Sequence, residues 1–301
     1  MSLTKTLENA ARTFLPPPAA RLAKRAAVGP RYAAQARQCR RGFAQYGDRY
    51  PQRVIFVAGL PKSGTTWLER MLGSFPGFHD VMIPDVASHE LRTGGSHDYD
   101  LPQNTFERFG EMLVLLKMHV HGSMHNVEVL QHSGVRYAVL FRDLRDVAVS
   151  NFFYVRNTPW HPEHPHYAGR SIEEGLGLFA DRTLPAYEAW VRSWDANRDP
   201  ESSVVLRYEE MLENACVALR KLVDLFELRA SDDEVAAIVE ANSFKRLSAG
   251  RGQGQESGTS FFRKGVAGDW VNHFTPELKE RYKAVIGRFL VDYGYEQDLS
   301  W

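Results

Sequence analysis

A glycine- and hydroxyl-rich segment, Gly59 to Thr66, is the first part of this chain whose residue types could do chemistry. It lies between an apolar run, Val54 to Ala58, and a segment with helical spacing. Free backbone N–H groups and the positive end of a helix dipole favour a bound phosphate at such a junction. In a regular Walker A motif Lys directly follows the second Gly, whereas here Thr65 takes that place and Lys62 lies inside the loop. The segment therefore predicts a phosphate site whose lysine faces the transferred group; a plain turn that caps a helix is the alternative.

A second candidate group lies at the end of another apolar run, Met112 to Val120. If this run is a strand, its period of two places Lys117 and His119 on one face, and His121 continues the row. A histidine can take the proton of an attacking hydroxyl, and a lysine can balance charge that develops on a leaving oxygen. The spacing alone does not choose between His119 and His121.

Two basic clusters could bind a further phosphate. Arg142 closes an apolar run at the edge where ligands bind, and its guanidinium can donate two parallel hydrogen bonds to a phosphate. Ser150, two helical turns later, can donate another. Arg263 and Lys264 stand beside Gly265, which allows close backbone approach. The alternatives are an ion pair between Arg142 and a nearby Asp, and a solvated basic turn.

The elements that must position these residues are short apolar runs that alternate with helical patterns. The runs are Val54 to Ala58, Met112 to Val120, Tyr137 to Phe141 and Ser203 to Tyr208, and helical spacing follows at Thr65 to Leu72 and Glu209 to Phe226. This alternation is typical of an α/β protein with a central, mostly parallel sheet flanked by helices, where ligands bind at the carboxyl ends of the strands. Because no internal repeat is present, we expect one domain over residues 51–301, preceded by a basic N-terminal arm over residues 1–50.

Composition excludes several classes of function. The 301 residues include 37 Lys or Arg and 37 Asp or Glu, so no net charge attracts nucleic acid or an anionic membrane. Cys39 and Cys216 lack metal-ligand spacing and fit a reduced compartment, which indicates a cytoplasmic protein. No apolar run reaches the roughly 18 residues of a membrane span. Residues 1–47 carry nine Lys or Arg against Glu8 alone, which favours a solvated arm over a transit peptide.

Three segments together resemble one protein family. Pro61 to Trp67 resembles the 5′-phosphosulfate loop of the cytosolic sulfotransferases, Arg142 to Ser150 is similar to their 3′-phosphate segment, and Arg263 to Trp270 is similar to their carboxyl-terminal cofactor motif. The resemblance implies a P-loop-like sulfotransferase fold and the cofactor 3′-phosphoadenosine-5′-phosphosulfate (PAPS, with PAP as its product). It also implies transfer of a sulfuryl group to a hydroxyl or amine of a small acceptor.

The resemblance also implies roles for single residues. His119, in the family's Lys-x-His segment, is the general base, Lys62 is the cation at the leaving oxygen, and Lys117 is a second stabiliser. Trp67 and Phe244 sandwich the adenine, with Tyr208 at its edge; Asn242 stands where the family usually has Thr. The implied cofactor-binding residues are Lys62, Ser63, Gly64, Thr65, Thr66, Trp67, Arg142, Ser150, Tyr208, Phe244, Arg263, Lys264 and Gly265. No metal is needed, because the lysines supply the positive charge that Mg²⁺ supplies in kinases.

Three other functions compete with this interpretation. A nucleotide kinase with a degenerate loop explains neither Arg142 to Ser150 nor Arg263 to Gly265. A non-catalytic module that binds PAPS or PAP has little need of the base His119. A membrane-anchored carbohydrate sulfotransferase is disfavoured by the missing anchor and by the motif Arg263 to Trp270.

Acceptor identity and oligomeric state are less defined. We expect the acceptor site to be formed by Pro84 to Leu101, Phe152 to Tyr167 and Ser248 to Phe261, whose aromatic, His and Gly content suits a partly apolar hydroxylated molecule. Asn157 to Arg170 and Ser248 to Ser260 are predicted to be long loops. The family's short dimer motif is degraded, with Val271 and Thr275-Pro276 at its positions, so the oligomeric state stays open.

Overall fold

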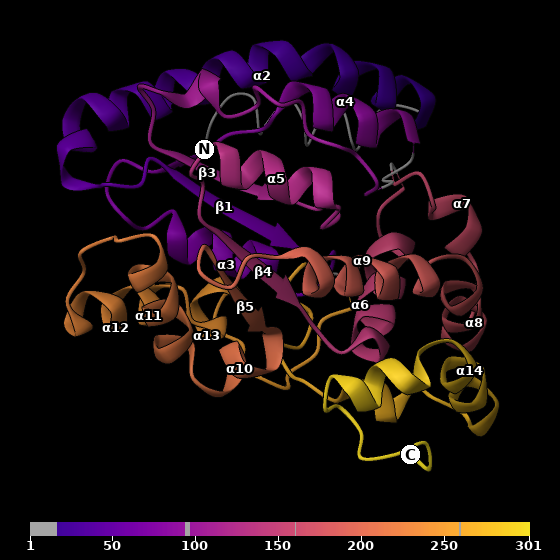
Figure 1. Cartoon of the computed structure of the whole chain (residues 1–301). Coiled ribbons are helices and arrows are strands. Elements are labelled where there is room, and N and C mark those ends of the chain that lie inside the picture. The colour runs from indigo at the N-terminus through magenta and orange to yellow at the C-terminus, as the bar shows by residue number, and fades with distance from the viewer. Residues whose placement is uncertain (1–16, 94–96, 160, 259) are drawn as a thin grey trace.

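Five strands form one sheet in the computed structural model, which describes residues 17–93, 97–159, 161–258 and 260–301. The strands are β1 Val54–Gly59, β2 His79–Asp80, β3 Val114–Met118, β4 Tyr137–Phe141 and β5 Ser203–Arg207. Their order across the sheet is β2-β3-β1-β4-β5, and every neighbouring pair is parallel (Figure 1). The predicted α/β class with a parallel sheet is confirmed, and the four apolar runs are its four longer strands.

The sheet is apolar on both faces, because each face carries its own core. β1 is buried along its whole length. Phe56 and Ala58 belong to one core, which includes residues of α5, α6, α8, α9 and α14; Ile55 and Val57 belong to the other, formed with α3, α10 and α11. Successive strand residues point to opposite faces, so a strand covered on both sides shows a continuous apolar run instead of alternation.

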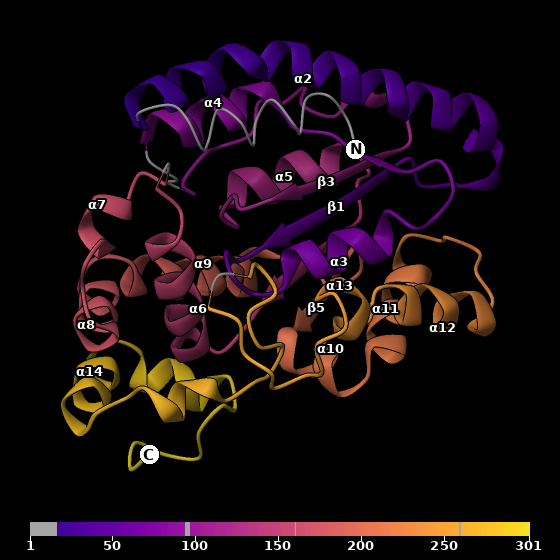
Figure 2. The same ribbon diagram turned by 180° about the vertical axis from the view of Figure 1, so that it is seen from behind.

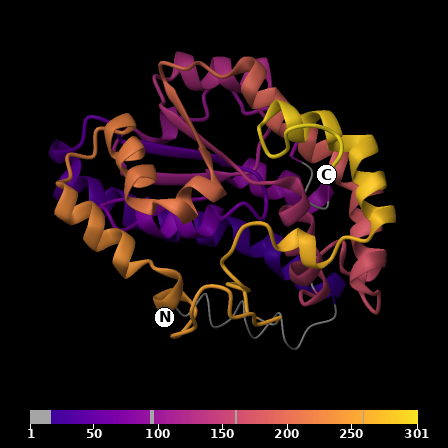
Figure 3. The same cartoon turned by 90° about the horizontal axis from the view of Figure 1, so that it is seen from below.

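Helices surround the sheet, with α12 and α14 at opposite ends of the molecule (Figure 3). The α-helices are α2 Pro17–Tyr46, α3 Thr65–Leu72, α4 Pro84–Thr93, α5 Met124–His132, α6 Leu144–Arg156, α7 His164–Tyr167, α8 Ile172–Arg182, α9 Leu184–Asn197, α10 Tyr208–Glu213, α11 Ala215–Leu225, α12 Asp232–Ala241, α13 Phe244–Leu247 and α14 Pro276–Asp292. Single 3₁₀ turns occur at Gly47–Arg49, Glu107–Phe109 and Asp269–Asn272.

Helix α2 packs on the fold, whereas the composition of this segment indicates a solvated arm. It runs beside α4 along the β2 edge of the sheet (Figure 2). Ala36 and Cys39 are buried, and Gln35 Nε2 donates to Asp80 Oδ2 at 2.8 Å. The helix thus covers an edge strand that would otherwise expose unpaired backbone groups. Residues 1–16 lie outside the described residues, so the boundary at residue 50 stays a prediction.

Two other expectations differ in detail from the structure. The helical stretch Glu209 to Phe226 is two helices, because Asn214 (φ −150°) ends α10 and its side chain accepts a hydrogen bond from Val217 N to cap α11. Asn157 to Arg170 holds the single-turn helix α7, and Trp160 lies outside the described residues. In the described part of Ser248 to Ser260 no helix or strand is present.

Strand order reverses at β1, since β3 lies on one side of β1 and β4 on the other. Parallel sheets leave a crevice for ligands outside the carboxyl ends of the strands at such a point. The segments that follow β1, β3, β4 and β5 begin with Leu60, His119, Arg142 and Tyr208. The fold therefore brings the segments at Leu60, His119, Arg142 and Tyr208 to one edge of the sheet.

Candidate active site

A pocket of about 1170 Å³ lies at this edge of the sheet. Except for Ser63, every catalytic or cofactor-binding residue implied by the sequence lines it. These residues are Lys62, Gly64, Thr65, Thr66, Trp67, Lys117, His119, Arg142, Ser150, Tyr208, Phe244, Arg263, Lys264 and Gly265. Segments that are up to about 200 residues apart in the chain thus form one cavity.

The loop between β1 and α3 has the backbone conformation of a phosphate cradle. Lys62 and Gly64 are both left-handed, with φ of 67° and 85°. A Cβ on Gly64 would lie 2.6 Å from a ring carbon of Tyr208, so both the conformation and the space require glycine. Ser63, between these two residues, is fully buried, and its Oγ has no partner among the described residues. At the start of α3 the amide of Trp67 already donates to the carbonyl oxygen of Gly64, whereas the amides of Thr65 and Thr66 precede the hydrogen-bonded turn and are available to an anion.

Lys62 places its ammonium group among aromatic rings at the pocket. Its Nζ lies 3.8 Å from the ring centroid of Tyr154 and 5.0 Å from that of Phe261. Burial, and then the charges of Arg142 and Lys117, lower the pKa of Lys62 to about 7. A bound anion would relieve this clustering of positive charge.

His119 is held in one tautomer. Its Nδ1 lies 2.5 Å from the carbonyl oxygen of Gly59, which can only accept, so Nδ1 carries the hydrogen and Nε2 keeps its lone pair. Burial, the neighbouring ring of His97 and the charge of Lys117 lower the pKa of His119 to about 3. The imidazole is therefore neutral near pH 7, as a base must be before it takes a proton.

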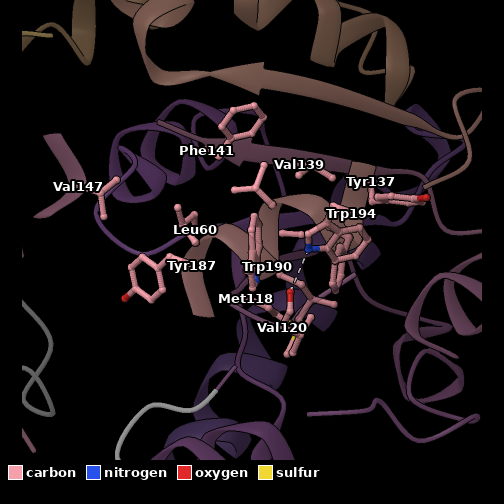
Figure 4. Close-up of a cluster of buried hydrophobic side chains, with 14 of the residues drawn as sticks. Leu60, Met118, Val120, Tyr137, Val139, Phe141, Val147, Tyr187, Trp190 and Trp194 are labelled. Carbon is pink, nitrogen blue, oxygen red and sulfur yellow. Dashed lines mark hydrogen bonds between the residues drawn. The ribbon is translucent and has the colours of Figure 1, made fainter. Parts of the chain in front are cut away.

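Helix α9 fixes the backbone that carries His119. Trp190 Nε1 donates to the carbonyl oxygen of His119 at 2.8 Å, and Trp194 Nε1 donates to that of Val120 at 3.2 Å. Figure 4 shows both indoles packed in the buried cluster beside the end of β3. Trp190 also lines the pocket. No motif in the sequence marks these two tryptophans, because their role depends on how α9 packs.

Lys117 and His121 both line the pocket and both have acidic partners. Lys117 Nζ lies 3.2 Å from Glu69 Oε2 on α3, and His121 Nε2 lies 3.2 Å from Asp100 Oδ1. Strand periodicity did not decide between His119 and His121 as the general base. Only His119 has its Nδ1 bound to a backbone carbonyl, which leaves its Nε2 lone pair for a proton. The ammonium of Lys117 has three N–H donors, of which the contact with Glu69 uses one.

Arg142 is buried and only partly satisfied. Its Nη2 donates to Asp146 Oδ2 and to the carbonyl oxygen of Val266, both at 2.8 Å, and its guanidinium lies 4.3 Å from the ring centroid of Tyr208. Its Nε is buried and has no partner among the described residues. Asp146 also accepts from the backbone amides of Gly268 and Trp270. The ion pair expected as the alternative is present, and the side chain still has a donor for a ligand.

The basic triplet reaches the pocket from the loop before α14. Arg263 donates to Glu256 and Asp269, and Lys264 also bonds to Asp269. Gly265 is left-handed, with φ of 68°, and a Cβ on it would lie 2.4 Å from a ring carbon of Phe244. The backbone of this loop therefore lies directly against the aromatic ring.

Trp67 is oriented by a backbone contact, since its Nε1 donates to the carbonyl oxygen of Asn242 at 2.9 Å. Its ring meets that of Tyr208 edge-on, with centroids 6.3 Å apart. The side-chain amide of Asn242 donates to Ser74 Oγ and to the carbonyl oxygen of Ile238. Asn242 stands where the family usually has Thr. It does not line the pocket, so its side chain does not face an adenine base bound there.

The other half of the pocket combines segments that the sequence indicated with helices that it did not. Each of the three segments expected to bind the acceptor contributes residues, among them Leu91, Tyr167 and Phe261. Further wall residues come from α2 and α9 and comprise Ala27, Val28, Arg31, Ala186, Tyr187, Ala189, Trp190 and Ser193. His97 lines the pocket as well. Since α2 is distant in sequence from every motif, only its packing reveals this contribution.

Two searches were confined to the described residues. Within them, no group of three or more His, Cys, Asp or Glu side chains is arranged to hold a metal ion. Within the same ranges, no helix is both long and apolar enough to span a bilayer.

Comparison with known proteins gives one family. A family model described as "Sulfotransferase domain" matches residues 52–294. Sulfotransferase 1B1 of Canis lupus familiaris is 27% identical over 255 residues, which are 77% of this chain and 81% of the relative. Flavonol 3-sulfotransferase of Flaveria bidentis is 26% identical over 256 residues, covering 77% and 80%. The resemblance drawn from the three motifs is confirmed.

Solved structures agree with the fold. A mouse sulfotransferase complexed with PAP superimposes with a TM-score of 0.60 at 23% identity, covering 80% of this chain and 88% of that chain. Retinol dehydratase in complex with androsterone and PAP gives a TM-score of 0.56 at 18% identity, covering 84% and 86%. At these identities the likeness establishes the fold.

Proposed function

Because the chain belongs to the sulfotransferase family, we propose that it transfers a sulfuryl group from PAPS to a hydroxyl or amine of a small acceptor. The observation that carries this function is a single pocket that joins two separate anion-binding clusters to a neutral histidine. One cluster is the loop at Lys62, and the other contains Arg142 and Arg263. A molecule with phosphates at two ends fits such an arrangement, and two structural neighbours are complexed with PAP.

Features of the pocket support PAPS as the ligand. Gly64 and Gly265 let the rings of Tyr208 and Phe244 pack directly against the backbone, so each cluster has an aromatic ring held beside it. The unpartnered Nε of Arg142 is a buried donor that a 3′-phosphate would satisfy. Trp67 and Phe244 also line the pocket. We assign their aromatic faces to the adenine of the ligand.

In the proposed reaction PAPS supplies the sulfuryl group, with a phosphate oxygen as the leaving group. His119 Nε2 takes the proton of the acceptor hydroxyl as the oxygen attacks in line. Lys62 balances the charge that develops on the leaving oxygen, and Lys117, whose ammonium has donors besides the one bound to Glu69, contributes further positive charge. The bond from His119 Nδ1 to the carbonyl of Gly59 stabilises the imidazolium that forms.

The acceptor half of the pocket supports a small, partly apolar acceptor. Ala27 and Val28 of α2 and the rings of Tyr187 and Trp190 line the pocket, and Trp190 also bonds to the backbone of His119. The Arabidopsis thaliana relatives are named cytosolic sulfotransferases, which agrees with the expected cytoplasmic location.

The function is tested by incubating the protein with ³⁵S-labelled PAPS and a panel of phenols, alcohols and amines. We expect labelled product with several hydroxyl acceptors and none when ATP labelled at the γ-phosphate replaces PAPS. Phosphoryl transfer from ATP would favour the kinase. Tight binding of PAP without turnover of any acceptor would favour the non-catalytic module.

Chelation of metal ions is expected to leave this activity unchanged. The charge at the leaving oxygen is balanced by Lys62 and Lys117, so no step of the proposed reaction needs Mg²⁺. Initial rates with and without 5 mM EDTA, after dialysis against the chelator, measure the dependence. A loss of more than about tenfold that Mg²⁺ restores would contradict the assignment of these lysines.

Binding of PAP is expected to take up a proton at pH 8. The pKa of Lys62 is about 7 in the free protein, so at pH 8 this side chain is mostly neutral. Anionic phosphates raise that pKa and protonate the lysine, whereas at pH 6 it is already charged and no uptake follows. Calorimetric titration in buffers of different ionisation enthalpy measures the number of protons, which should approach one at pH 8.

The control for this titration is the variant Lys62→Met, in which the uptake at pH 8 should vanish. Lys221→Met removes a half-exposed lysine paired with Glu210 and should leave the uptake intact. Equal uptake in Lys62→Met and the wild-type protein would mean that another group titrates.

A further inference from the structure

His97 is a second histidine in the pocket wall, and the proposed reaction does not use it. Its ring centroid lies 5.5 Å from that of His119 and 6.0 Å from that of Tyr187. Its Nδ1 is buried and has no hydrogen-bond partner among the described residues. Because buried polar atoms in folded proteins nearly always have partners, the surroundings of Nδ1 bear on which ring nitrogen carries the hydrogen.

The protonation state of His97 follows from its surroundings. Burial lowers the pKa of His97 to about 4, so the ring is neutral near pH 7 and carries one N–H. Because no acceptor among the described residues faces Nδ1, the hydrogen is better placed on Nε2. His97 thus presents a hydrogen-bond donor, whereas His119 presents a lone pair.

On the basis of the proposed function, we propose that His97 is a second acceptor-binding residue, whose Nε2–H donates to the same hydroxyl oxygen that gives its proton to His119. A hydroxyl has one hydrogen and two lone pairs. The hydroxyl donates its hydrogen to His119 and accepts from His97 with one lone pair. Only its other lone pair then remains to form the bond to sulfur. The two imidazoles thereby fix the rotation of the hydroxyl for in-line attack.

The separation of the rings permits this geometry. A ring nitrogen lies about 1.2 Å from the ring centre, and a hydrogen bond adds about 2.9 Å, so a shared oxygen would lie about 4 Å from each centre. Two centres 5.5 Å apart meet that condition with an angle of slightly less than 90° at the oxygen, which is about 20° below the tetrahedral value.

The arrangement has a consequence for the class of acceptor. A neutral amine has a single lone pair, which must attack sulfur and therefore cannot also accept from His97. The pair of histidines thus favours hydroxyl acceptors over amines of the same shape. Loss of the His97 donor should slow transfer to hydroxyls and leave transfer to amines unchanged.

The test compares matched acceptors that differ only in the nucleophile, such as 4-methylumbelliferone and 7-amino-4-methylcoumarin, with other hydroxyl and amine pairs beside them. The variant His97→Phe keeps a ring without the donor. We expect its kcat for the hydroxyl probes to fall 10- to 30-fold with less than twofold change for the amines. His97→Gln, whose amide N–H can replace Nε2–H, should recover most of the rate.

Three further measurements separate a binding role from a structural one. PAP affinity and the unfolding midpoint of His97→Phe should match those of His132→Phe, an exposed histidine at the end of α5. The ¹³Cε1 resonance of His97 should shift when 4-methylumbelliferone is added to the protein saturated with PAP. If His97→Phe lowers kcat equally for hydroxyl and amine probes, or does not lower it, the role of His97 is wrong, although the proposed function still stands. Failure of the wild-type protein to transfer to any probe would overturn the proposed function as well.

Discussion

Replacing His119 by alanine is expected to lower kcat by about 10³-fold while PAP still binds with wild-type affinity. General-base catalysis contributes about 10²- to 10⁴-fold, and the low pKa of His119 keeps its Nε2 lone pair available at any pH near neutrality. With PAPS saturating, the rate should also stay flat between pH 6 and 8, because His119 is already neutral there and the bound phosphates keep Lys62 protonated. Single-turnover transfer from labelled PAPS, beside calorimetric titration with PAP, measures both quantities.

A second variant guards against a structural explanation. His119→Asn places an amide N–H near the position of Nδ1, so it can keep the bond to the carbonyl of Gly59 without supplying a base. It should lose as much rate as His119→Ala and unfold at the wild-type temperature. His132→Ala, on an exposed face of α5, is the matched control. A loss of less than tenfold in His119→Asn would mean that another group, with His121 first among them, takes the proton.

Most of the sheet could be predicted because its strands are buried on both faces. Such strands leave continuous apolar runs in the sequence, and the runs at Val54 and Tyr137 match β1 and β4 within one residue. The edge strand β2 could not be predicted, because its two residues, His79 and Asp80, are both exposed and polar. Helix α2 was missed for a related reason, since few of its side chains are buried and its basic composition resembles that of a solvated segment.

The cofactor half of the candidate site was more predictable than the acceptor half. Its residues lie in short segments directly after strands, so parallel topology alone brings Lys62, His119 and Arg142 to one edge. The choice between His119 and His121 needed the contact with Gly59, which strand periodicity does not contain. His97 lies in the segment Pro84 to Leu101 that was expected at the acceptor site, whereas Val28 and Tyr187 reach the pocket from α2 and α9. Their positions depend on long-range packing, for which a single sequence has no local signal.

Replacing Arg142 by glutamine is expected to weaken PAP binding by about 10²- to 10³-fold while binding of AMP changes less than threefold. PAP and AMP differ only in the 3′-phosphate, so their ratio isolates contacts to that group. Hydrogen bonds to charged partners contribute about 1.5–3 kcal/mol each, so two bonds from one guanidinium near the lower end of this range give a loss of this size. The unpartnered Nε of Arg142 is the donor that the 3′-phosphate would engage.

The ratio of PAP affinity to AMP affinity is needed because Arg142 also makes contacts within the protein. Its removal leaves Asp146 without its cation, although the amides of Gly268 and Trp270 still donate to that carboxylate. A general disturbance of the pocket would weaken PAP and AMP by the same factor, which would contradict a contact to the 3′-phosphate. Arg288→Gln, on an arginine of α14 whose side chain is 81% exposed, should leave both affinities unchanged. If the wild-type protein itself binds AMP as tightly as PAP, the second anion-binding cluster does not recognise a 3′-phosphate, and PAPS is not the donor that this pocket selects.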